Sequence, residues 1–322
     1  MKKKYKNSYM LKLLLLCILI LPGVSCWDGL NDMLEEAGSP SAIMFTQSSL
    51  TSGGMTINWT DPAFVTGYDH IIVTYTPGSP VTLNKGVTSF NVSGLVSSTE
   101  YKVTVQAMGK EDIIKAQSSF KVTPSGSYTL RFIYTAADLD SVRSNLNYYY
   151  VVMNDLDLSG YANWDPIGIF SGILDCQNYR ISNMTMNRNE GLLGLFERVE
   201  GTVKNCIING FITGTLSTSY IGGIVGEVLT SGAILNCSST VSITATGLNS
   251  RLGGIAGNIL GTGQIRNCSA KGDITSTGGS SFPGGLVGFC SASTNVVINC
   301  YATGKVVASG DQSSVGGLTG RN

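Results

Sequence analysis

The sequence predicts an all-β protein in which a β-sandwich is followed by a β-helix (β-solenoid) with a short N-terminal capping helix. Three observations lead to this fold class. Only 13% of the 322 residues are charged and 40 are glycine, which is typical of turn-rich β proteins. Short alternating runs between turn residues fill the first half of the chain. A repeat of about 31 residues fills its end.

The balanced formal charge of the chain conceals a mildly acidic body. Basic and acidic residues both total 21, but five lysines lie in the first 25 residues, which hold no acid. The remaining 16 basic and 21 acidic residues disfavour nucleic acid as a partner. The single histidine, His70, excludes a two-histidine zinc site and an HExxH helix. We therefore expect no metal site and no cofactor.

Residues 1–25 have the layout of a secretory signal peptide. A basic start precedes the apolar run LLLLCILIL, which is too short to span a bilayer. The segment resembles a bacterial lipoprotein signal, in which Cys26 becomes the lipidated first residue. Gly23 replaces the usual leucine, and an ordinary signal peptidase could cut the same bond. The resemblance implies a lipid-anchored protein of the bacterial cell envelope, at the outer membrane or cell surface, with residues 26–40 as a tether.

Residues 41–124 contain short alternating runs, which predict a sandwich. The runs are Ser41–Gln47, Met55–Thr60, His70–Thr76, Ser89–Val92, Tyr101–Ala107 and Ile114–Val122. Trp59 ends the second run, and Leu95 precedes Tyr101, which opens the fifth. This pattern resembles a fibronectin type III domain. The resemblance implies structural roles for Trp59 in the core and for Tyr101 in a tyrosine corner.

Residues 191–322 repeat with steps of 31, 31 and 32 residues. The repeat is marked by an Asn-Cys pair, whose members are Asn205, Cys206, Asn236, Cys237, Asn267, Cys268, Asn299 and Cys300. Three further columns are apolar: Val203, Ile234, Ile265 and Val297; Ile212, Ile243, Ile274 and Val306; and Phe196, Val228, Ile259 and Cys290. Fixed apolar columns predict stacked coils around a shared core, with two or three strands in each turn.

The repeat resembles the GLUG motif. Gly285-Leu286-Val287-Gly288, followed by Asn299-Cys300-Tyr301-Ala302-Thr303-Gly304, carries the likeness. Residues 125–190 resemble the opening segment of such domains. The resemblance implies a β-helix of bacterial surface and secreted proteins. Similar arrays occur in immunoglobulin A-cleaving zinc peptidases and in adhesin-like proteins, but the peptidase unit is absent here.

One helix is expected near the start of the solenoid. Thr135 can cap it, with Asp138 three residues later. Leu139, Val142 and Leu146 would then share one face. We expect this helix to cover the first coil, because an open coil end exposes core and strand edges.

The column of Cys206, Cys237, Cys268 and Cys300 has three interpretations. A bend at each preceding asparagine would turn the cysteines inward as buried reduced thiols, which we favour, and would stack the amides. Disulfides are the second interpretation, because the protein is exported. A metal or redox site is the third, although no CxxC is present.

No catalytic residues are predicted. A glycosidase needs close carboxylates, whereas Glu227, Asp273 and Asp311 occupy different columns of the repeat. Asp155, Asp157 and Asp165 are interpreted as turn residues, with calcium binding as the alternative.

The sequence therefore favours a non-enzymatic surface protein that displays an adhesin-like interaction module. Its expected partners are the membrane, through the lipid, and an extracellular protein or glycan. The alternatives are a carbohydrate-binding or carbohydrate-active β-helix and a purely structural envelope protein. The sequence stops seven residues into a fifth repeat. We expect this edge either to pair with a second copy, end to end, or to belong to a longer protein.

Overall fold

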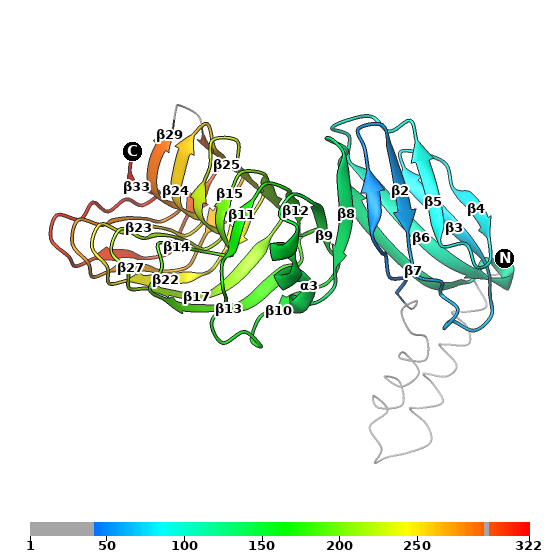
Figure 1. Ribbon diagram of the computed structural model, residues 1–322, viewed down its shortest axis with the longest axis horizontal. Helices are drawn as coiled ribbons and strands as arrows, with labels where there is room; N and C mark the ends of the chain where they lie inside the picture. Colours follow the sequence, from blue (N-terminus) through cyan, green and yellow to red (C-terminus); the bar gives the residue numbers. More distant parts are fainter. Residues whose placement is uncertain (1–41, 293–295) are drawn as a thin grey trace, which may run out of the picture.

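The computed structural model describes residues 42–292 and 296–322, which form a β-sandwich and a β-solenoid side by side (Figure 1). The predicted all-β fold class is confirmed, with one short α-helix in the described chain. The predicted signal peptide, Cys26 and the tether lie outside the described residues. Within the described part, no helix is long and apolar enough to cross a membrane.

The sandwich has two antiparallel sheets. One contains β4-β3-β6-β7, and the other contains β1-β2-β5. Their strands are β1 (Ser48–Leu50), β2 (Gly54–Asn58), β3 (Tyr68–Thr76), β4 (Val81–Asn84), β5 (Ser89–Ser93), β6 (Tyr101–Gly109) and β7 (Ile114–Val122). The first expected run is wrong as a strand: the structure has only an isolated Phe45–Trp59 bridge there, and β1 begins at Ser48. Trp59 is buried, and the Tyr101 hydroxyl accepts a 2.9 Å hydrogen bond from the Val96 amide.

A single strand joins the sandwich to the solenoid. β8 (Tyr128–Ile133) pairs antiparallel with β1 and parallel with β9 (Tyr149–Val152). One ten-stranded sheet therefore runs through both parts of the molecule. Both faces of β9 are buried: Tyr149 packs in the sandwich core, and Tyr150 packs in the solenoid core.

Hydrogen bonds also connect the sandwich and the solenoid outside the shared strands. The Gln177 side chain accepts a hydrogen bond from the Lys121 amide at 2.8 Å and donates one to the Lys121 carbonyl at 3.0 Å. The Phe45 amide donates to the Tyr134 hydroxyl at 2.7 Å. Because shared strands and shared cores connect the two parts, we infer that they move as one body.

The solenoid turns through four parallel sheets in each coil, rather than the expected two or three strands. The ten-stranded sheet includes β12 (Ile173–Asp175), β16 (Thr202–Lys204), β20 (Ala233–Leu235), β25 (Gln264–Arg266) and β30 (Val297–Ile298). The next includes β10 (Leu156–Asp157), β13 (Arg180–Arg188), β17 (Ile207–Gly214), β21 (Ser238–Ser239), β22 (Ser242–Ala245), β26 (Ser269–Ala270), β27 (Ile274–Ser276), β31 (Tyr301–Ala302) and β32 (Val306–Ala308).

The other two sheets meet at the Gly-Gly sequences. One has β14 (Leu192–Leu193), β18 (Tyr220–Gly222), β23 (Arg251–Gly253) and β28 (Phe282–Gly284). The other has β11 (Ile167–Phe170), β15 (Phe196–Val199), β19 (Val225–Val228), β24 (Ala256–Gly261), β29 (Val287–Ala292) and β33 (Thr319–Arg321). The additional sheet arises because each Gly-Gly corner ends one strand and starts the next within two residues.

Glycine at this corner allows two backbones to touch. A Cβ added at Gly257 would lie 2.4 Å from the backbone nitrogen of Ile221, and one at Gly288 would lie 2.5 Å from that of Leu252. Any side chain would therefore force the two sheets apart. The last glycine of each Gly-Gly-x-x-Gly sequence is thus a packing requirement.

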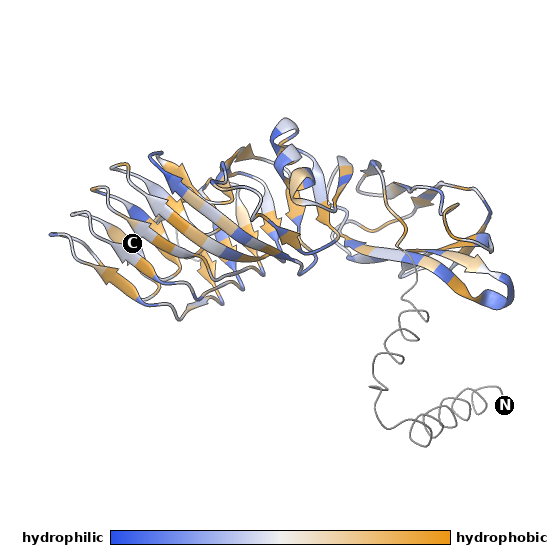
Figure 2. Cartoon of the chain, turned by 90° about the horizontal axis from the view of Figure 1, so that it is seen from below, coloured by the Kyte–Doolittle hydropathy of each residue, from blue (hydrophilic) through white to orange (hydrophobic). Residues whose placement is uncertain are grey.

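The apolar columns form the continuous core, and the strands alternate between apolar and polar residues (Figure 2). Ile234 pairs with Val203 and Ile265, as the repeat predicted. One column was misaligned: Val199, not Phe196, pairs with Val228. The reason is that the loop before β20 is two residues longer than the loop before β16, so the spacing changes within one coil.

The expected capping helix is present but short. α3 (Ala136–Asp140) carries the predicted capping box between Thr135 and Asp138, and the 3-10 turn η2 (Ser141–Ser144) follows it. A second 3-10 turn, η1 (Lys110–Asp112), lies between β6 and β7. Leu139 and Val142 are fully buried in the solenoid core. The helix therefore covers part of the first coil, and the sandwich covers the outer face of β9.

The stacked core makes a sharp prediction for stability. Ile234→Asp should lower the free energy of unfolding by about 3–5 kcal/mol, because it buries a charge with no partner. Arg266→Asp, on a half-exposed position of the neighbouring strand, should cost less than about 1 kcal/mol. Chemical denaturation of both variants measures the difference. Equal losses would contradict the assigned register.

Candidate functional site

Outward side chains of the two sheets that meet at the glycine corner contact one another across it, and we call the surface that they form the corner groove. It is lined by nine side chains in register from coil to coil. They are Leu192, Tyr220, Arg251 and Phe282 on one wall, and Arg198, Glu227, Asn258, Phe289 and Arg321 on the other. Stacking of coils about 4.8 Å apart turns these positions into two facing rows.

The first half of the groove contains a closed polar network. The Glu227 side chain is 8% exposed, and its carboxylate forms an ion pair with Arg198 at 2.9 Å. Its other carboxylate oxygen accepts a 2.8 Å hydrogen bond from the Asn258 amide nitrogen. These donors compensate a buried charge. The Asn258 side-chain oxygen is buried and has no partner among the described residues.

The second half of the groove is a cation–π ladder. The Arg251 guanidinium lies 4.5 Å from the Tyr220 ring centroid and 4.2 Å from that of Phe289. The Arg321 guanidinium lies 5.1 Å from the Phe282 ring and 5.8 Å from the Phe289 ring. Neither guanidinium forms an ion pair or side-chain hydrogen bond with the part of the chain that the structure describes. Their N–H donors are therefore available to a ligand.

The groove opens into a hollow at its N-terminal end. This hollow has a volume of about 480 Å³ and is lined by Glu190, Gly191, Leu192, Glu197, Arg198, Thr218 and Tyr220. Glu190 is already paired with Arg188 at 2.9 Å. The acids thus gather at one end of the groove and the unpaired arginines at the other.

Sequence reasoning missed the corner groove. Its residues stand at fixed offsets from the glycines: Tyr220, Arg251 and Phe282 come two positions before each Gly-Gly pair, and Glu227, Asn258, Phe289 and Arg321 follow the last glycine of each corner. Because their chemical type changes from coil to coil, these columns look like variable solvent positions. The signal that could have found them is their size and charge beside obligatory glycines.

The predicted Asn-Cys positions form two ladders on another side of the solenoid. Asn205, Asn236, Asn267 and Asn299 all have positive φ between 53° and 57°. Each side-chain amide donates a hydrogen bond of 3.0–3.3 Å to the equivalent asparagine of the previous coil. Asn205, the first of the four, donates instead to the Asp175 carboxylate at 2.9 Å. The bend places each following cysteine toward the core, because it resets the alternation of side chains.

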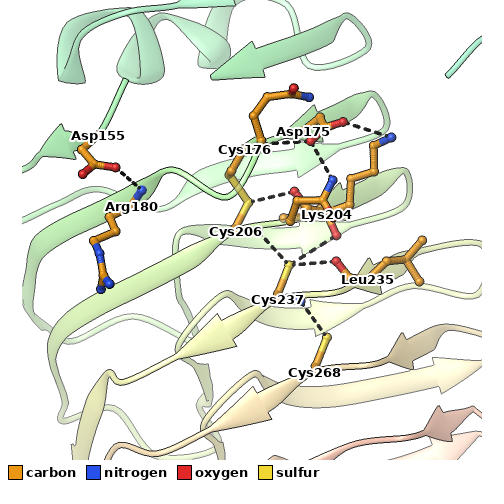
Figure 3. Close-up of a disulfide and its surroundings, with 12 residues drawn as sticks. Asp155, Asp175, Cys176, Arg180, Lys204, Cys206, Leu235, Cys237 and Cys268 are labelled. Carbon is orange, nitrogen blue, oxygen red and sulfur yellow. Dashed lines mark hydrogen bonds and ion pairs between the residues drawn. A yellow bond between two sulfur atoms is a disulfide. The ribbon is translucent and has the colours of Figure 1, made fainter. Parts of the chain in front are cut away.

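The cysteine column is correct in register, but the favoured reduced state is wrong at Cys206. Cys206 forms a disulfide with Cys176, 30 residues earlier (Figure 3). Cys237, Cys268 and Cys300 are free thiols. The contact with the Cys237 thiol raises the pKa of Cys268 to about 12, and the contact with Cys268 raises the pKa of Cys300. These two thiols therefore stay protonated near neutral pH.

The early acidic residues hold turns and strands together. Asp155 accepts the Arg180 amide at 2.8 Å, Asp157 accepts the Ser159 amide at 2.9 Å, and Asp165 pairs with Arg188 at 3.0 Å. Among residues 42–292 and 296–322, no group of three or more histidine, cysteine or acidic side chains is arranged to hold a metal ion.

The disulfide gives a testable prediction. Non-reducing peptide mapping should find Cys176 linked to Cys206. Cys176→Ser combined with Cys206→Ser should lower the free energy of unfolding by about 2–4 kcal/mol, because the 30-residue loop is no longer closed in the unfolded chain. Cys300→Ser, at the half-exposed end of the column, should cost less. Recovery of Cys206 linked to Cys237 would contradict the assignment.

Comparison with known families identifies both parts of the fold. The fibronectin type III domain matches residues 38–113. The GLUG motif matches residues 217–244 and 249–275, which include Tyr220, Glu227, Arg251 and Asn258 of the corner groove. No curated protein sequence matches the chain.

Solved structures give weaker likenesses. The spore cortex lytic enzyme SleM of Clostridium perfringens is 16% identical, with 26% of this chain and 28% of that chain covered and a TM-score of 0.23. An FN3 domain of human collagen XX is 21% identical, with 27% and 98% covered and a TM-score of 0.22. A family 28 exopolygalacturonase of Yersinia enterocolitica is 8% identical, with 86% and 80% covered and a TM-score of 0.23. These likenesses are too weak to carry an argument about activity. From the family matches, the chain contains a fibronectin type III domain followed by GLUG motifs.

Proposed function

We propose that this chain is a non-enzymatic, lipid-anchored protein of the bacterial cell surface that displays its solenoid to extracellular ligands, in the manner of an adhesin. The signal-like residues 1–25, Cys26 and the tether support the anchor. The corner groove supports the interaction role, because it presents unpaired donors and aromatic rings on a rigid surface.

The observation that carries this proposal is the ten-stranded sheet shared by the sandwich and the solenoid. An interaction surface works at a distance from the membrane only if its support keeps it extended. Here β8 pairs with both parts, so the sandwich acts as a rigid spacer rather than as a flexibly linked module. The corner groove is then held away from the anchor.

The alternative is a carbohydrate-active β-helix. The corner groove favours a carbohydrate more than the sequence alone suggested, because aromatic, arginine and carboxylate side chains lie in it together. Catalysis by a glycosidase mechanism needs two carboxyl groups with separate acid and base roles. The Glu227 carboxylate is occupied by Arg198 and Asn258. Glu190 is paired with Arg188, so Glu197 is the one carboxylate of the hollow without an ion pair among the described residues. We therefore propose binding rather than hydrolysis, and a glycan or a protein as the ligand.

The anchor is tested at Cys26. Cys26→Ala should abolish labelling by a fatty-acid probe and release the protein from the membrane fraction, because the lipid is the proposed attachment. Antibody labelling of intact cells, with and without the variant, measures display. Wild-type protein that is already soluble outside the cell would contradict the lipid anchor.

We also propose end-to-end self-association through the last described coil. β30, β31, β32 and β33 each have a partner on only one side among the described residues. Val315 is 50% exposed and Leu318 is 38% exposed on this edge. Unpaired strand edges with apolar side chains favour pairing with another chain.

Light scattering tests this association. The chain lacking residues 1–25 should form a dimer that Leu318→Lys converts to monomer, because the lysine places a charge on the pairing edge. Lys271→Ala, on an exposed position one coil earlier, is the matched control and should leave the dimer intact. Monomeric wild-type protein at high concentration would contradict the proposed pairing.

A further inference from the structure

The corner groove holds Arg251 between two aromatic rings. Its guanidinium lies against Tyr220 at 4.5 Å and Phe289 at 4.2 Å. Stacking on a ring face fixes the plane of a guanidinium but uses none of its N–H groups, which point outward in that plane. Arg321 is held in the same way by Phe282 and Phe289. Both cations are therefore held beside aromatic rings before any ligand arrives.

The charge of the groove selects an anion at this end. The Arg198 charge is neutralised by Glu227 at 2.9 Å. No acidic side chain among the described residues pairs with Arg251 or Arg321, so two positive charges remain. A planar guanidinium with free donors suits carboxylate and sulfate groups, which accept two parallel hydrogen bonds.

The spacing selects a polymer. Arg321 lies two coils beyond Arg251, since Phe289 pairs with both Asn258 and Arg321. Two coil steps correspond to about 10 Å along the solenoid axis. From Tyr220 to Arg321 the corner groove extends over three coil steps, about 14 Å, which a single small anion cannot cover. An extended chain that carries acidic groups at intervals can do so.

The remaining groove residues fit sugar rings. Phe282, Phe289 and Tyr220 are half-exposed and supply apolar surface beside the two cations. Asn258 supplies a buried side-chain oxygen that has no donor in the described structure. Sugars present both apolar ring faces and hydroxyl donors, so they match this mixture better than an all-polar ligand does.

We propose that the corner groove between Arg251 and Arg321 binds an anionic polysaccharide, whose carboxylate or sulfate groups pair with the two guanidiniums while its rings lie against the aromatic side chains. This inference rests on the interaction role proposed above and names the class of ligand. The binding involves no covalent step.

Binding to defined polymers tests the inference. The chain lacking residues 1–25 is titrated by calorimetry with alginate, which carries carboxylates, with dextran sulfate, and with uncharged dextran. At least one anionic polymer should bind, and dextran should not. The two anionic arms distinguish carboxylate from sulfate recognition. Glucuronate alone should bind far more weakly, because it covers only a fraction of the corner groove.

Matched variants locate the site. Arg251→Gln and Arg321→Gln should each weaken binding of the preferred polymer about tenfold, the loss of one charge-assisted contact. Arg266→Gln, on a different sheet, should leave the affinity unchanged. Thermal unfolding of each variant checks that the fold is intact. Wild-type affinity in both groove variants would overturn the proposal.

Two other results would also overturn it. If uncharged dextran binds as tightly as the anionic polymers, the charge of the polymer does not contribute to binding. Duplex DNA that competes equally would show a general anion surface rather than a glycan site. Surface labelling and attachment of intact cells are scored separately. If they persist while polymer binding fails, only the glycan inference is wrong. If the wild-type protein is absent from the cell surface, the proposed function is wrong instead.

Discussion

Parallel backbone hydrogen bonding between coils, in a fixed register, is the constraint on which the rest of the solenoid depends. It places each residue about one strand spacing from its equivalent in the next coil. A residue type that recurs at one position of the repeat therefore forms a row of identical side chains along the solenoid. Isoleucine and valine become the core, asparagine becomes a chain of amide hydrogen bonds, and Cys237, Cys268 and Cys300 become a column of thiols.

The same constraint explains why the corner groove exists. The backbones of two sheets touch at the glycines, so the first side chains beyond that contact must face each other across a narrow outer angle. These side chains point away from the core, so core packing does not restrict which residue types can occupy their positions. Arg251, Phe289 and Arg321 can therefore be selected for contact with a ligand, while the glycines beside them keep the walls in place.

Much of the fold was predictable because the repeat is regular. The Asn-Cys pairs indicated the register, and Ile234 and its equivalents indicated the core. The predictions failed where the period is broken: Val199 is out of step because one loop is two residues shorter, and Cys176 lies in a coil without the Asn-Cys pair. The corner-groove residues stand at fixed offsets from the glycines, but they change in chemical type from coil to coil. The double pairing of β8 left no periodic signal. That pairing depends on distant segments meeting, which one sequence does not reveal.

The position of the disulfide has a mechanical consequence. Tension applied at the last coil would peel coils away one at a time, since each is held mainly by its neighbour. The segment from Cys176 to Cys206 would not extend, because the covalent bond carries the load across that loop. The coils beside β9 would stay folded on the sandwich. A ligand pulling on the solenoid would thus lengthen the protein while its base remained intact.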